Sequence, residues 1–201
     1  MDRRAFLSLA AGAAVTSAAW AGGIEPTYFE LTHTTVRLGT PRPWRILHIS
    51  DIHMSDGVKA ADIQNAVESG LAQKPDLVFL TGDFVSSIHD FNRQDLFHLL
   101  RRVRGAAPSY AVLGNHDSGT RLARGGGSRS TKFMQDLIRS SGVRLLYNES
   151  VTLEGLTLVG VADLWSGAFN LPRAFSAAPP DTKTLLLCHN PDGKDLARHW
   201  R

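Results

Sequence analysis

Short apolar runs alternate with amphipathic segments in the first part of the chain. The amphipathic segments repeat apolar residues at helical spacing, as Ile63, Val67 and Leu71 do before the stop at Pro75. The apolar runs are too short for helices and are typical of buried parallel strands. The pattern predicts strands at residues 44–49, 77–80 and 110–113, and helices at residues 59–73, 92–103 and 131–139.

The pattern becomes rich in strands after residue 142. Short runs separated by turns predict strands at residues 143–147, 151–154 and 156–161, which we expect to pair antiparallel. Further elements are expected as strands at residues 28–38 and 184–188 and a helix at residues 192–199. A βαβα half followed by a β-rich half predicts one α/β domain over residues 28–201, with two packed sheets and helices outside them.

The N-terminus has the pattern of an export signal. Arg3 and Arg4 form a positively charged start, an alanine-rich apolar stretch follows, and residues 19–21 (Ala-Trp-Ala) fit a cleavage site. The segment from Arg3 to Leu7 resembles the twin-arginine export motif. We therefore expect residues 1–21 to be a signal peptide, and a bacterial protein that is exported, periplasmic or membrane-associated. A frayed N-terminal helix and an uncleaved membrane anchor are the alternatives.

Composition narrows the class of protein. Of 201 residues, 43% are apolar and 20% are charged, which is typical of a globular protein and argues against disorder. The formal net charge of +3 suits an anionic substrate without singling out nucleic acid. The sequence has one cysteine, Cys188, which excludes an internal disulfide and a cysteine-based zinc knuckle. No window of about 18 apolar residues predicts an ordinary transmembrane helix.

Four of the predicted strands end in side chains that bind metals. The residues that carry these side chains are Asp51 and His53 after the first strand, Asp83 after the second, Asn115, His116 and Asp117 after the third, and His189 after the last. Because the carboxyl ends of strands line the ligand crevice of an open α/β sheet, we expect these side chains to gather in one place. Gly82 and Gly114 let the chain turn tightly beside them.

The spacing and type of these residues indicate a metal centre. Asp51 and His53 are two residues apart, so in an extended segment both side chains point to one side and can share a cation. Mixed oxygen and nitrogen ligands suit Mn, Fe or Zn better than Ca or Mg. Asp83 has two carboxylate oxygens and is expected to bridge two ions. Two ions about 3.5–4 Å apart can hold a phosphate and generate the attacking hydroxide.

The segment Gly-Asn-His-Asp supplies three further roles. We expect the neutral carbonyl oxygen of Asn115 to bind metal, which limits the negative charge of the site. His116 is expected to stay off the metal and to contact the phosphate or protonate the leaving group. Asp117 is expected to orient His116.

Asp-x-His, Gly-Asp, Gly-Asn-His-Asp and a later strand-end His, in this order, resemble the calcineurin-like metallophosphoesterase family. The likeness extends from Ile46 to Asp192. It implies a four-layer αββα sandwich that hydrolyses phosphate monoesters, diesters or pyrophosphates with two metal ions and a metal-bound hydroxide. The ligands carried over by position are Asp51, His53 and Asp83 for one metal and Asp83, Asn115 and His189 for the other, with His116 as the substrate-contacting acid.

The export signal and the sequence His-Asn-Pro-Asp from His189 resemble a bacterial membrane-associated subgroup. Some of its members cleave nucleotide-activated lipid A precursors. This resemblance implies a phosphorylated small molecule or a lipid-linked phosphate ester as substrate and association with a membrane surface. We expect no nucleic-acid partner, because the sequence lacks a broad basic patch.

One family motif is absent from the sequence. The family has a Gly-His-x-His segment some tens of residues after the equivalent of His189, and the sequence to Arg201 contains none. We therefore expect a C-terminally truncated domain that lacks the last strands of one sheet. The alternative functions are a catalytically impaired fragment or scaffold module of the same fold, and a nuclease, which the lack of a broad basic patch disfavours.

A basic, glycine-rich segment at residues 120–130 follows the Asn-His motif directly. Arg121 and Arg124 are candidates to hold the outer part of an anionic substrate. A flexible, solvated loop is the alternative. The segment is not a P-loop, because no strand precedes the glycines and no Gly-Lys-Ser/Thr follows them.

Overall fold

The computed structural model describes residues 29–117 and 130–198. The chain divides into the units Met1–Thr34 and Thr35–Arg201, and the helices and strands named below belong to the second unit. The expected signal peptide and the basic residues Arg121 and Arg124 lie outside the described residues. Within the described ranges, no helix has the length and apolar character needed to cross a membrane.

The first sheet is entirely parallel. Its strands follow the order β1 (Ile46–Ile49), β2 (Leu77–Thr81), β3 (Ser109–Val112) and β4 (Arg144–Leu145). Each pairs in parallel with its neighbour, so the carboxyl ends of all these strands lie at one edge of the sheet. Every residue of β2 and β3 is buried, which explains why both read as continuous apolar runs in the sequence.

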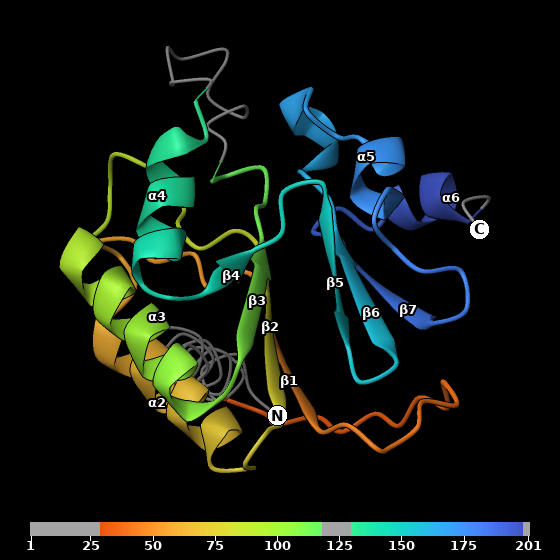
Figure 1. The fold of residues 1–201 in the computed structure, drawn as a ribbon. Helices are drawn as coiled ribbons and strands as arrows, with labels where there is room; N and C mark the ends of the chain where they lie inside the picture. The colour runs from red at the N-terminus through yellow and green to blue at the C-terminus, as the bar shows by residue number, and fades with distance from the viewer. Residues whose placement is uncertain (1–28, 118–129, 199–201) are drawn as a thin grey trace, which may run out of the picture. The chain divides into compact units, whose positions relative to one another are not determined.

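Helices α2 (Ala60–Leu71), α3 (Arg93–Ala106) and α4 (Lys132–Ser140) cover one face of this sheet (Figure 1). The predicted apolar stripe of α3 is buried, and Asn92 caps its start by accepting hydrogen bonds from the N–H groups of Gln94 and Asp95. Apolar side chains of these helices and the sheet form one core cluster. The helical stripes read from the sequence therefore mark the surfaces that hold the outer layer to the sheet.

The second sheet contains β5 (Glu149–Leu153), β6 (Leu156–Gly160) and β7 (Lys183–Leu187), with β6 in the middle. β5 pairs antiparallel with β6, whereas β6 and β7 are parallel. The short helices that accompany this sheet are η4 (Leu164–Ser166, a 3-10 helix), α5 (Leu171–Phe175) and α6 (Gly193–Ala197). Figure 1 shows α5 and α6 beyond the second sheet, away from the first.

The buried clusters follow the layers. Phe79 and Tyr110 of the first sheet pack with Leu156 and Leu158 of the second, so the two sheets share an apolar interface. A smaller cluster joins the second sheet to α5. The order helix, sheet, sheet, helix is the expected αββα sandwich.

Two strand predictions are wrong. Residues 143–147 do not join the antiparallel part: β4 lies parallel to β3 in the first sheet, where the N–H of Leu146 also donates to the Ala111 carbonyl (2.8 Å). The segment 28–38 forms no strand in its described part, residues 29–38, which is mostly exposed. Alternating residues favour an extended chain, but a strand also requires a neighbour that accepts its backbone hydrogen bonds.

Candidate metal centre

The loops that leave β1 and β2 stay joined beyond the ends of the strands. The N–H of Asp51 donates to the Gly82 carbonyl (3.1 Å), and the N–H of His53 donates to the Asp83 carbonyl (2.9 Å). A last bond joins the Met54 N–H to the Phe84 carbonyl (2.9 Å). The parallel pairing of the strands thus continues into the residues that carry the polar side chains.

Three of these residues have left-handed backbone conformations. The φ angles are 54° for Asp51, 47° for His53 and 52° for Asp83. A side chain in this region costs on the order of 1–3 kcal/mol, and such residues cluster at functional sites. The local turns aim all three side chains into the space at the sheet edge, a feature that residue spacing alone does not reveal.

The β2 and β3 loops touch backbone to backbone at two glycines. A Cβ atom on Gly114 would lie 2.5 Å from the Asp83 nitrogen, and one on Gly82 (φ 90°) would lie 2.7 Å from the Gly114 Cα. Both distances are closer than a real Cβ approaches a backbone atom. Glycine at both positions therefore lets Asp83 and Asn115 come together, as the sequence predicts.

The carboxylate of Asp83 is at the centre of the cluster. Its Oδ2 atom lies 3.5 Å from His53 Nε2, 3.9 Å from His116 Nε2 and 3.4 Å from His189 Nε2. The side chain is only 5% exposed. Three histidines from three different loops therefore converge on one buried carboxylate oxygen.

Two residue sets around Asp83 have the spacing of a metal site. One contains His53, Asp83 and His116 and the other Asp51, Asp83 and His189, with donor atoms within 4.8 Å of one another in each set. Asp83 belongs to both. Asn115 lies beside the second set, with its Oδ1 atom 3.2 Å from His189 Nε2. The structure thus brings together all the expected ligands.

Backbone carbonyls orient two of the histidines. His189 Nδ1 donates to the Thr81 carbonyl (2.8 Å), and His116 Nδ1 donates to the Ser86 carbonyl (2.7 Å). In each ring the other nitrogen, Nε2, then faces Asp83. Hydrogen bonds of this kind fix the tautomer and direction of a metal-binding or catalytic imidazole.

The expected role of Asp117 needs correction. Its carboxylate is fully buried and accepts three backbone hydrogen bonds, from Gly114 (2.8 Å) and Asp83 (2.9 Å) at Oδ2 and from Phe84 (2.9 Å) at Oδ1. The acceptor at His116 Nδ1 is instead the Ser86 carbonyl. Asp117 therefore holds the loop after β2 and the loop after β3 together, because its carboxylate accepts hydrogen bonds from backbone N–H groups of both.

Burial and mutual charge shift the pKa values of the cluster. The hydrogen bond to Asp83 raises the pKa of His189 to about 9, against the opposing effect of burial. Burial acts to raise the pKa of Asp83, but hydrogen bonds from His189 and the His116 N–H outweigh it and hold the pKa low. Burial raises the pKa of Asp117 to about 7, although its backbone N–H partners oppose that shift.

The donor atoms fit a divalent cation. Carboxylate, amide and imidazole donors together suit Zn, Mn or Fe. A low pKa keeps Asp83 negative at neutral pH, and a cation at this position would replace the proton that His189 otherwise carries.

Asp163 is a further acid near the cluster that the sequence reasoning did not identify. It is 2% exposed, and its Oδ1 atom has no hydrogen-bond partner in the described part of the chain. Burial raises its pKa, the nearby charge of Asp83 adds to the rise, and that of His189 opposes it. Asp163 follows the predicted strand at residues 156–161, so the rule applied to the other strand ends would have found it.

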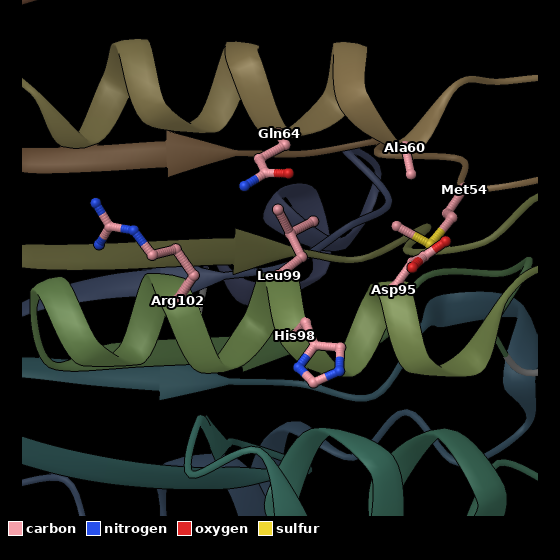
Figure 2. Close-up of a pocket in the computed structure, with 7 residues that line it drawn as sticks. All are labelled: Met54, Ala60, Gln64, Asp95, His98, Leu99 and Arg102. Carbon is pink, nitrogen blue, oxygen red and sulfur yellow. The ribbon is translucent and has the colours of Figure 1, made fainter.

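A pocket also lies between α2 and α3 (Figure 2). It is lined by Met54, Ala60, Gln64, Asp95, His98, Leu99 and Arg102. None of the expected ligands lines it, although Met54 follows His53 in the chain. The candidate metal ligands therefore lie at the carboxyl ends of the strands and do not line this pocket.

Comparison with known proteins agrees with the geometry. The family model for calcineurin-like phosphoesterases matches residues 45–200. This chain belongs to the calcineurin-like phosphoesterase family. It is therefore a phosphoesterase hydrolase of a family that uses divalent metals, and the family resemblance read from the sequence is confirmed.

Relatives of this calcineurin-like phosphoesterase include named hydrolases. It is 32% identical to phosphodiesterase YaeI of Escherichia coli, over 98% of this chain and 73% of that protein. It is 25% identical to the UDP-2,3-diacylglucosamine pyrophosphatase LpxG of Chlamydia trachomatis, over 94% of this chain and 70% of that protein. A metallophosphoesterase of Bacillus subtilis, YkuE, is 27% identical over 96% of this chain and 70% of that protein.

Proposed function

We propose that this phosphoesterase hydrolyses phosphodiesters or pyrophosphates with a centre of two divalent metal ions. The observation that supports it most directly is the position of Asp83, whose Oδ2 atom lies within 4 Å of the Nε2 atoms of three histidines. A single carboxylate common to two donor sets is the arrangement that a bridging ligand requires.

The ligands divide between the two ions in this proposal. Asp51, His53 and Asp83 hold one ion, and Asp83, Asn115 and His189 hold the other. This division differs from the two donor sets, in which His53 groups with His116 and Asp51 with His189. It is supported by the 3.7 Å distance between His53 Nε2 and Asp51 Oδ1. Bound there, the ions would supply positive charge for the phosphate oxygens and lower the pKa of a water molecule near the phosphorus. The protein contributes a rigid donor set, because hydrogen bonds between the β1 and β2 loops and to Asp117 fix its backbone.

His116 has the role of general acid in this proposal. Its Nδ1 atom is held by the Ser86 carbonyl at 2.7 Å, so the ring is oriented with Nε2 towards the centre. From there Nε2 can donate a proton to the leaving oxygen. His53 packs edge-on against it, with ring centroids 4.8 Å apart, and limits its movement.

The named relatives support a proposal for the substrate class. YaeI is a phosphodiesterase and LpxG a pyrophosphatase of UDP-2,3-diacylglucosamine. We propose that this chain also cleaves a phosphodiester or pyrophosphate of a phosphorylated small molecule or a lipid-linked ester. Arg121 and Arg124 are proposed to hold the outer part of the anionic substrate.

Metal content and turnover test this function together. The purified full chain is loaded with Mn²⁺, Zn²⁺ or Fe²⁺, its bound metal is counted by elemental analysis, and a phosphomonoester, a phosphodiester and a pyrophosphate are assayed. We expect two metal equivalents and preference for the diester or pyrophosphate. A chain that binds one ion or none and hydrolyses no ester would contradict the proposal and favour an interaction module of the same fold.

We also propose that the protein is exported through the twin-arginine route. The support is the sequence from Arg3 to Leu7 and the Ala-Trp-Ala site at residues 19–21. Replacing Arg3 and Arg4 by Lys keeps the charge but removes the pair that the export receptor reads. The double variant should accumulate in the cytoplasm, and normal export of it would argue against this route.

A further inference from the structure

An aromatic side chain stands exposed on the turn that follows β6. Trp165 belongs to the 3-10 helix η4 and is 62% exposed, although it is a large apolar residue. Its ring therefore offers a large, flat apolar face to solvent. The position of η4 relative to the metal ligands decides what this ring can contact.

The helix η4 follows β6 and His189 follows β7, and these two strands are parallel neighbours in the second sheet. The last bond of their ladder joins the Val161 N–H to the Leu187 carbonyl (3.2 Å). Asp163 and His189 each lie two residues beyond that bond, and the charge of His189 acts on Asp163. Trp165 is only two residues further along the same turn, so its backbone follows Asp163 closely at the carboxyl ends of β6 and β7.

Hydrogen bonds hold the turn in one conformation. Asp163 Oδ2 accepts from the Trp165 N–H (2.9 Å), and the hydroxyl of Ser166 donates to the Asp163 carbonyl (2.6 Å). The buried side chain of Asn148 spans the whole loop, accepting from the Ala162 N–H (3.1 Å) and donating to the Ala168 carbonyl (2.8 Å). These hydrogen bonds thus fix the backbone of the turn that carries Trp165.

We propose that Trp165 is a stacking platform for a flat aromatic ring of the substrate, such as a nucleobase joined to the scissile phosphate. This inference rests on the proposed phosphoesterase function and assigns a specificity-determining residue to it. One rigid aromatic face matches one planar group. An acyl chain would need an apolar groove, whereas the other exposed large apolar residues of the described chain lie on other segments.

Two diesters with the same leaving group test the platform. The p-nitrophenyl ester of thymidine 5′-phosphate carries a base, and p-nitrophenyl methyl phosphate does not. With Mn²⁺-loaded protein, Trp165→Ala should lower kcat/KM for the nucleoside ester roughly 5- to 100-fold, mainly through KM, the range expected for one lost base–aromatic stack. The methyl ester and the metal content should change little, and Trp165→Phe should retain most of the preference.

Matched controls separate the outcomes. Phe133→Ala removes an aromatic ring that is 38% exposed on α4 and should leave the ratio between the two esters unchanged. An equal loss with both esters in Trp165→Ala would indicate a structural role, and no loss with either would show that the ring is unused. A selective loss with p-nitrophenyl octyl phosphate would indicate an apolar chain. Each of the last three results would overturn the proposal.

A binding measurement separates this idea from the proposed function. If the wild-type protein hydrolyses none of the esters, equilibrium dialysis with thymidine 5′-monophosphate and Mn²⁺ still reports the platform. Binding that falls in Trp165→Ala and persists in Phe133→Ala supports the platform even when catalysis fails. Binding that is absent in the wild type or equal in both variants refutes it.

Discussion

The Oδ2 atom of Asp117 accepts a hydrogen bond from the backbone N–H of Asp83 at 2.9 Å. The same atom accepts from the Gly114 N–H, and Oδ1 accepts from the Phe84 N–H. One buried carboxylate therefore joins the loop after β2 to the loop after β3. The proposed bridging ligand owes its position to a residue that lies 34 positions away in the sequence.

Asp117→Asn should destabilise the protein and weaken metal binding. A carboxamide has one oxygen, so at least one of the three N–H groups would face the new NH2 group. A buried donor without an acceptor costs about 1–3 kcal/mol. Urea denaturation should show this loss. Asp136→Asn, which removes only the exposed pair with Lys132 on α4, should cost less than about 1 kcal/mol. Equal stability of the two variants would contradict the role assigned to Asp117.

Asp83→Asn should reduce activity more than the loss of any other single ligand. Asparagine tolerates the positive φ of 52° at this position, so the change tests charge with little added backbone strain. Both donor sets lose their common carboxylate, and activity should fall by more than the roughly 10- to 100-fold typical of outer-shell changes.

The matched control for Asp83→Asn is Asp51→Asn. Asp51 also has a positive φ, 54°, but belongs to one donor set only. Elemental analysis should show a smaller loss of metal in Asp51→Asn than in Asp83→Asn. Near-normal turnover of Asp83→Asn with two metals bound would be incompatible with a bridging role.

His116→Ala should retain metal while catalysis fails. A lost general acid lowers kcat by roughly 10²–10⁴. His53→Ala provides the comparison, because it removes a proposed ligand whose ring lies 4.8 Å from that of His116. His53→Ala should lose metal, whereas His116→Ala should hold as much as the wild type. Loss of one metal equivalent in His116→Ala would instead place His116 among the ligands, as its grouping with His53 and Asp83 allows.

The sequence predicted the layers and most of the candidate centre because both depend on regular patterns. Buried parallel strands read as apolar runs, and their carboxyl ends meet at one edge of the first sheet, which places Asp51 and Asp83 side by side. His189 joins them from the end of β7 in the second sheet. The helices that cover the first sheet followed from apolar stripes that each bury one face, whereas the four-layer αββα order was implied by the family resemblance. These features repeat along the chain, so local residues suffice to infer them.

Other features depend on contacts between distant segments and could not be read from local pattern. The three N–H partners of Asp117 come from two separate loops, so its structural role was mistaken for the orientation of His116. The parallel pairing of β4 depends on where the chain returns after α4 and not on its own two residues. The left-handed turn at His53 accompanies the hydrogen bond from its N–H to the Asp83 carbonyl. No glycine marks this turn in the sequence, so the local pattern did not predict it.

Gly114→Ala should disrupt the centre without replacing a ligand, because the new Cβ would clash with both the carboxylate and the backbone of Asp83. The new Cβ would lie 2.5 Å from the Asp83 nitrogen, a backbone atom that cannot rotate away, so the β2 and β3 loops must separate. Overpacking of this kind costs typically about 1–3 kcal/mol, and here it also breaks the hydrogen bonds that Asp117 makes to both loops.

The contrast is Gly105→Ala in α3, where a Cβ meets nothing within 4 Å. Alanine should stabilise that helix by up to about 1 kcal/mol and leave turnover unchanged. Thermal unfolding and metal content measured on both variants decide the matter. Gly114→Ala should unfold at lower temperature and bind less metal, while Gly105→Ala should do neither. A Gly114→Ala protein with full metal content would mean that the loops can part without loss of the centre, and the close approach of Gly114 to Asp83 would then not be what holds it together.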